Sequence, residues 1–79
     1  MKFYADEIGA TNQTALDLLY AENVDPLVLA AADYLARNYP HPEWWRFVRV
    51  DTMPDNGERG VLFACENSTL TIRESQARA

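Results

Sequence analysis

Apolar residues in the N-terminal half of the chain recur with the period of an α-helix. Within residues 12–22 they fall on one side of a helix, and polar residues fall on the other. The inward-facing set consists of Ala15, Leu16, Leu18 and Leu19. A strand fits this stretch less well, because Asp17 would then share a face with Leu19. Residues 12–22 are therefore expected to form an amphipathic helix.

A second helix is expected to begin after Asp25. Aspartate is a favoured N-cap residue, and Pro26 suits the first helical position, where a missing N–H costs nothing. Pro40 cannot continue a helix, so this one should end near Tyr39. Its predicted buried stripe consists of Leu27, Val28, Ala31, Tyr34 and Leu35.

The pattern changes from helical to alternating in the C-terminal half. Residues 44–51, 60–66 and 69–74 each read as a strand. The Pro-Asp-Asn-Gly run at 54–57 is a strong turn signal, and a short turn is expected at 67–68. Strands joined by such short turns form an antiparallel meander.

Alternation in the first strand predicts which side chains share a face of the sheet. Val48 and Val50 should lie on one face. The opposite face should hold Trp45, Phe47 and Arg49. The adjacent Trp44 and Trp45 then point to opposite faces. One of them is expected to pack inward, and the other to cover the far face or to contact a partner.

These elements predict a single α+β domain, with two helices followed by a three-stranded antiparallel meander. A chain of 79 residues can bury one core but not two. The expected organisation is an acidic helical part at 1–39, the sheet at 44–75 and a frayed tail at 76–79. Residues 2–8 fit either a short helix or an edge strand.

Acidic residues are concentrated in the N-terminal half of a chain whose formal net charge is −5. No lysine or arginine occurs from Phe3 to Ala36, whereas arginines balance the acids after that point. A surface of one sign repels phosphates and attracts basic surfaces. The candidate partner-binding residues are Asp6, Glu7, Asp17, Glu22, Asp25 and Asp33, together with Trp44 and Trp45.

The sequence offers little that could carry catalysis. Cys65 and His41 are the one potential thiol–imidazole pair, and Cys65 lies in an apolar strand where cysteine is usually inert. We expect no catalytic residue, no cofactor and no metal site, and hence not an enzyme. The chain starts without an apolar run suited to a signal peptide or a membrane span, so a cytoplasmic location with no membrane partner is expected.

Residues 5–35 resemble the helix-turn-helix of Cro- and repressor-type regulators. The matching positions are Ala5, Ile8, Gly9, Ala15, Leu18 and Pro26. The resemblance implies that the helix after the turn enters the major groove of DNA. Thr11, Asn12 and Gln13 would then lie at its N-terminal end, where asparagine and glutamine can read adenine. The same stretch lacks the basic residues that usually contact phosphates, which disfavours a direct nucleic-acid partner.

In its small size, acidity and lack of catalytic motifs, the chain is similar in type to phage-encoded inhibitors such as anti-CRISPR proteins. That resemblance implies a non-catalytic protein in the cytoplasm of a host cell. Such a protein would bind a complex with a basic nucleic-acid-binding surface and inhibit it by mimicking nucleic acid. The alternatives are a small helix-turn-helix DNA-binding regulator and a subunit of a toxin–antitoxin or other homo-oligomeric assembly.

Overall fold

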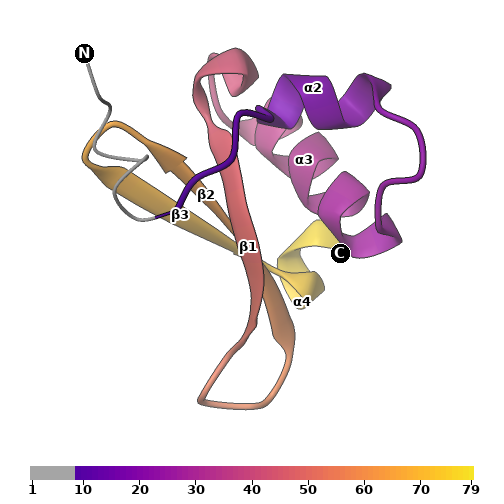
Figure 1. The fold of residues 1–79 in the computed structure, drawn as a ribbon. Coiled ribbons are helices and arrows are strands. Elements are labelled where there is room, and N and C mark those ends of the chain that lie inside the picture. The colour runs from indigo at the N-terminus through magenta and orange to yellow at the C-terminus, as the bar shows by residue number, and fades with distance from the viewer. Residues whose placement is uncertain (1–8) are drawn as a thin grey trace.

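The computed structural model describes residues 9–79 and shows an α+β fold in which helices precede strands (Figure 1). In chain order the elements are α2 (Ala15–Tyr20), α3 (Pro26–Asn38), the 3₁₀ turn η1 (Pro42–Trp44), β1 (Arg46–Thr52), β2 (Arg59–Cys65), β3 (Ser68–Arg73) and α4 (Glu74–Ala77). The predicted fold class is therefore confirmed. The alternatives for residues 2–8, and the candidates Asp6 and Glu7, fall outside the described residues.

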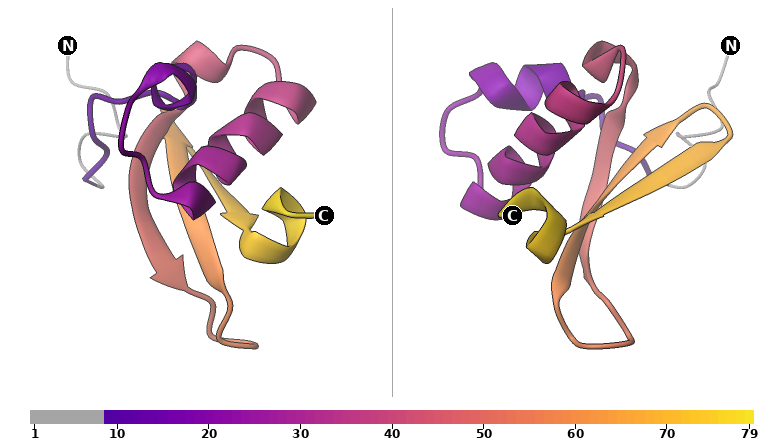
Figure 2. Two further views of the ribbon diagram at one scale, coloured as in Figure 1. Left: turned by 90° about the vertical axis from the view of Figure 1, so that its right-hand side faces the viewer. Right: turned by 180° about the vertical axis from the view of Figure 1, so that it is seen from behind.

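The three strands form an antiparallel sheet in the order β1-β2-β3, as the alternation predicts. The predicted turn at 54–57 lies in the loop between β1 and β2. The second turn lies one residue earlier than expected: Cys65 pairs with Ser68, so Glu66 and Asn67 form it. Figures 1 and 2 show α2, α3 and α4 on one side of this sheet.

α3 lies across the sheet and supplies much of the core. Its fully or almost fully buried residues are Leu27, Val28, Ala31, Ala32 and Leu35. The sheet contributes Val61, Phe63 and Ile72 to the same core. Tyr34, which was expected in the buried stripe, is half-buried and packs at the edge of this core.

Local signals set the bounds of α3 as predicted. The Asp25 carboxylate accepts a hydrogen bond from the Leu27 backbone N–H at 2.8 Å, and Pro26 occupies the first helical position. The helix ends at Asn38, just before the Tyr39–Pro40 pair.

α2 is shorter than the predicted helix over residues 12–22. It begins at Ala15, because Thr14 acts as the N-cap in a capping box. The Thr14 hydroxyl accepts the Asp17 N–H at 3.1 Å, and the Asp17 carboxylate accepts the Thr14 N–H at 3.1 Å. Residues 11–13 are instead held along β1 by backbone hydrogen bonds between Thr11 and Phe47 and between Phe47 and Gln13. The helical periodicity of residues 12–22 does not reveal that the first of them pair with β1 instead of joining the helix.

A β-bulge in β1 overturns the prediction that Val48 and Val50 share a face. The pairing register with β2 shifts between Phe47 and Arg49, so Val48 is an extra residue. Phe47 and Val50 both pack against the helix-covered core, whereas Val48 packs against Ala64 on the opposite face. One inserted residue therefore reverses the alternation for the rest of the strand.

Residues 76–77 of the tail predicted to fray belong to the helical turn α4 (Glu74–Ala77), which leaves residues 78–79 beyond it. α4 follows β3 directly and packs against α3. Ala77 is only 8 % exposed, which explains the order: its methyl group completes the core. Arg78 also pairs with Glu74 at 3.3 Å.

Candidate partner-binding site

The two adjacent tryptophans have opposite environments. Trp45 packs into the core and meets the Tyr39 ring edge-on, with ring centroids 6.4 Å apart. Trp44, the last residue of η1, is 58 % exposed. Trp45 is thus the tryptophan that packs inward, and Trp44 is the one available to a partner. Strand alternation is not the cause, because the strand predicted to begin at residue 44 begins only at Arg46, and Trp44 lies in η1.

Trp44 is held in place by its neighbours in the connector between α3 and β1. The His41 imidazole stacks on the indole, with centroids 3.8 Å apart and an interplanar angle of 11°. His41 Nδ1 also lies 3.1 Å from a carboxylate oxygen of Glu43. Backbone hydrogen bonding, followed by the His41 hydrogen bond, lowers the pKa of the Glu43 carboxyl. The exposed indole is therefore a supported platform beside a charged carboxylate.

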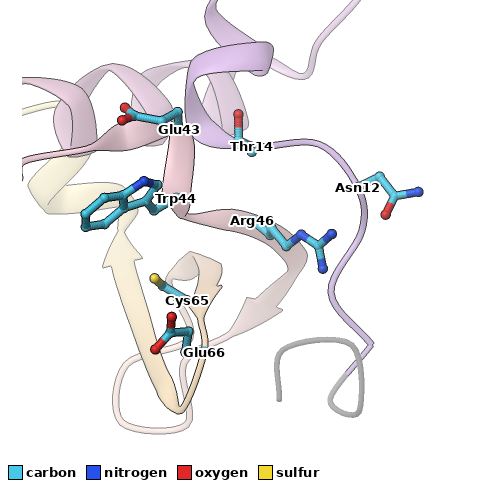
Figure 3. Close-up of a pocket in the computed structure, with 7 residues that line it drawn as sticks. All are labelled: Asn12, Thr14, Glu43, Trp44, Arg46, Cys65 and Glu66. Carbon is cyan, nitrogen blue, oxygen red and sulfur yellow. The ribbon is translucent and has the colours of Figure 1, made fainter. Parts of the chain in front are cut away.

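Trp44 borders a hollow of about 470 Å³, referred to below as the Trp44 hollow. It is lined by Asn12, Thr14, Glu43, Trp44, Arg46, Cys65 and Glu66 (Figure 3). In the view of Figure 3, Glu43 lies above Trp44, and Cys65 lies between Trp44 and Glu66; the Arg46 guanidinium points away from the indole, toward the side of Asn12. A volume of this size falls within the range of ligand-binding clefts.

The sequence predicts Trp44 as a contact residue but does not predict either glutamate of the hollow. Glu43 precedes Trp44 in the chain, so its proximity could have been anticipated. Glu66 is brought there only because the β1–β2 pairing places the end of β2 beside the start of β1, where Ala64 pairs with Arg46. No signal within a single segment of the sequence predicts that juxtaposition.

Two residues near Trp44 have a left-handed backbone. His41, which stacks on Trp44, has a φ of 58°, and Glu66, which lines the Trp44 hollow, has a φ of 53°. Positive φ values are uncommon for residues other than glycine, although asparagine, aspartate and histidine adopt them more often than the rest, and they often occur at functional sites. Of the described non-glycine residues with positive φ, only Asn23 lies elsewhere, in the α2–α3 loop. Strain is thus concentrated around Trp44.

Three of the four predicted acidic residues that the structure describes also have a local structural role. Asp17 and Asp25 accept backbone N–H groups at the starts of α2 and α3. Asp33 pairs with Arg37 at 3.0 Å. Glu22 is exposed and forms no ion pair within residues 9–79. It lines a second hollow, of about 390 Å³, next to Asp25.

Arginines in the described residues are largely compensated by nearby carboxylates. Four form ion pairs at 2.9–3.3 Å: Arg37 with Asp33, Arg49 with Asp51, Arg73 with Asp55 and Arg78 with Glu74. The carboxylates of Asp17 and Asp25, by contrast, interact with neutral N–H groups, and Glu22 and Glu66 form no ion pair within residues 9–79. Within residues 9–79, the charge that no ion pair compensates is therefore mainly acidic.

The three residues proposed to read DNA do not open a helix. Thr11, Asn12 and Gln13 lie in the non-helical segment before α2. The Thr11 N–H donates to the Phe47 carbonyl at 2.8 Å, and the Phe47 N–H donates to the Gln13 carbonyl at 2.8 Å. The Thr11 hydroxyl donates to the same Phe47 carbonyl. These bonds fix the segment along β1, so its side chains are not presented as those of a recognition helix.

Cys65 and His41 do not form a hydrogen-bonded pair in the structure. Burial, together with the nearby Glu66 carboxylate, raises the pKa of the Cys65 thiol, the opposite of what activates a nucleophile. Residues 9–79 contain no cluster of three or more His, Cys, Asp or Glu side chains suited to a metal ion. No helix in that part of the chain is long and apolar enough to cross a membrane.

Comparisons with protein-family models, curated proteins and solved structures found no match to this chain.

Proposed function

We propose that this chain is a non-catalytic protein that binds the basic, nucleic-acid-binding surface of a partner complex and inhibits that complex. The observation that carries the proposal is the distribution of uncompensated charge. A carboxylate that accepts a neutral N–H keeps its full negative charge, as Asp17 and Asp25 do. Carboxylates paired with arginine, such as Asp51 and Asp55, present little net charge. A basic partner is therefore attracted to the acidic residues of the helical part.

The same charges weigh against the other candidate functions. Direct DNA binding would bring phosphates onto an acidic surface, and the proposed reading residues are engaged with β1. A homo-oligomer joined through the acidic residues would place like charges against each other, which is unfavourable. The similarity in type to anti-CRISPR proteins implies inhibition by nucleic-acid mimicry. That mode requires neither phosphates on the acidic surface nor contact between two acidic surfaces.

The test is competitive capture. The full chain is immobilised and exposed to a nuclease-treated bacterial lysate, and retained proteins are eluted with duplex DNA. The expected result is a retained nucleic-acid-binding protein that DNA releases. The same protein should lose its own nucleic-acid binding when the soluble chain is added.

Matched amide variants separate specific binding from general acidity. Asp17→Asn with Glu22→Gln removes two uncompensated charges and leaves an amide oxygen to cap α2. Asp51→Asn with Asp55→Asn removes two charges that already pair with arginines. The first pair should weaken partner binding about three- to tenfold, and the second much less. Equal effects, or a retained protein that DNA does not release, would refute the proposal.

A further inference from the structure

We propose that the Trp44 hollow binds an arginine side chain, whose guanidinium stacks on the open face of the Trp44 indole beside the Glu66 carboxylate. This inference rests on the proposed function only for the source of the arginine, the basic surface of the partner protein.

The indole is a platform with one open face. His41 covers the other face, parallel to the ring within 11°. Trp44 is 58 % exposed even with this cover, so the area that remains accessible is large. Tryptophan has the most favourable aromatic face for a cation. Its open face is also pre-positioned, because η1 and the His41 stack fix the ring before a ligand arrives.

The carboxylates at the hollow supply the charge complement. Glu66 is exposed and forms no ion pair within residues 9–79. Glu43 adds a second negative charge, held near His41. Arg46 carries the opposing charge in the lining, and in Figure 3 its guanidinium points away from Trp44. The side of the hollow that holds Glu43, Trp44 and Glu66 therefore attracts a cation more than the side toward which Arg46 points.

Arginine fits this arrangement better than lysine. A guanidinium is planar, so it can stack on an indole while its N–H groups donate to a carboxylate at the edge of the ring. An ammonium has no plane to stack and is more strongly hydrated. The hollow of about 470 Å³ is large enough for one such side chain.

The experiment measures binding of three short capped peptides to the ¹⁵N-labelled full chain by NMR. The peptides are identical except for a central arginine, lysine or citrulline, and citrulline has nearly the shape of arginine without its charge. The indole N–H signals of the chain's 2 tryptophans report the site, and Trp44→Phe assigns them. The arginine peptide should shift the Trp44 signal saturably, with at least tenfold weaker binding of citrulline and clearly weaker binding of lysine.

Glu66→Gln and Glu22→Gln form the matched pair of variants. Both remove one uncompensated carboxylate, but only Glu66 lines the Trp44 hollow. Glu66→Gln should weaken the arginine peptide about three- to tenfold, whereas Glu22→Gln should leave it nearly unchanged. Trp44→Leu, which keeps an apolar side chain, should abolish saturable binding. Equal binding of citrulline or lysine, equal effects of the two glutamine variants, or shifts confined to Trp45 would each overturn the inference.

The outcomes also separate this inference from the proposed function. If the arginine peptide binds as expected but no DNA-releasable protein is captured, the hollow is an arginine site and the proposed function fails. If such a protein is captured and Glu66→Gln leaves its affinity unchanged, the proposed function stands and the arginine site is refuted.

Discussion

The helical part of the molecule (residues 14–39) and the sheet part (residues 46–73) use their carboxylates differently. In the helical part, Asp17 and Asp25 accept backbone N–H groups, and Asp33 is the one that pairs with an arginine among the described residues. In the sheet part, Asp51 and Asp55 pair with arginines, and Glu66 is the exception that forms no ion pair within residues 9–79. Both arrangements satisfy the carboxylate locally, yet only the second cancels its charge. A capping residue can therefore stabilise its helix and still contribute to a charged binding surface.

The two parts are joined through Trp45, and its replacement should have the largest effect on stability. The Trp45 carbonyl accepts the Ala15 N–H at 2.8 Å, and its ring packs into the core beside Tyr39. Trp45→Ala is expected to lower the free energy of unfolding by about 2–4 kcal/mol, because it leaves a cavity between helices and sheet. Chemical denaturation followed by circular dichroism measures the change.

Trp44→Ala is the matched control for this prediction. Because Trp44 is mostly exposed, its removal should change the free energy of unfolding by only about 0.5 kcal/mol. A loss from Trp44→Ala as large as that from Trp45→Ala would mean that Trp44 is a core residue, and would remove the basis for the Trp44 hollow as a binding site.

Sequence signals predicted the elements whose bounds are set locally. α3 begins and ends where Asp25, Pro26 and Pro40 place it, and β2 and β3 follow the alternation. The errors have long-range causes. The start of α2 is delayed by hydrogen bonds from residues 11–13 to Phe47, and the faces of β1 are reversed by a bulge that depends on pairing with β2.

The residues of the candidate site also divide into those predicted from local sequence signals and those placed by long-range contacts. Trp44 was predicted as a contact residue from its type and from its neighbour Trp45. The acidic residues were predicted from composition, and the structure adds which of them cap helices. Glu66 was not anticipated, because it joins Trp44 in the lining of the hollow only through strand pairing and its own left-handed turn conformation. The periodicity of one segment cannot predict a surface that is formed by residues from distant segments.

Removing the N-cap of α3 should have an intermediate effect on stability. The measurement tests whether the carboxylates of the helical part have a structural role. Asp25→Ala is expected to cost about 1 kcal/mol of stability, because the Leu27 N–H loses its acceptor. That corresponds to a fall in Tm of several degrees in a domain of this size. Asp25→Asn retains an acceptor oxygen and should restore most of the loss. If Asp25→Asn is as unstable as Asp25→Ala, charge rather than capping is responsible.

The smallest expected effect concerns Asp55 in the sheet part and appears as a pH dependence. Hydrogen bonding from Arg73, at 2.9 Å, lowers the pKa of the Asp55 carboxyl in the folded chain. A carboxyl whose pKa is lower in the folded state than in the unfolded state stabilises the fold above its unfolded pKa of about 3.9. That contribution is lost as the pH falls through the folded pKa.

Asp55→Asn should therefore lower Tm slightly at pH 7 and have almost no effect near pH 2. Added salt should reduce the Tm difference at pH 7. Thermal melts of the two proteins across this range make the measurement. A Tm difference that stays constant with pH would show that Asp55 acts through its turn geometry. Its pairing with Arg73 would then not distinguish the carboxylates of the sheet part from those of the helical part.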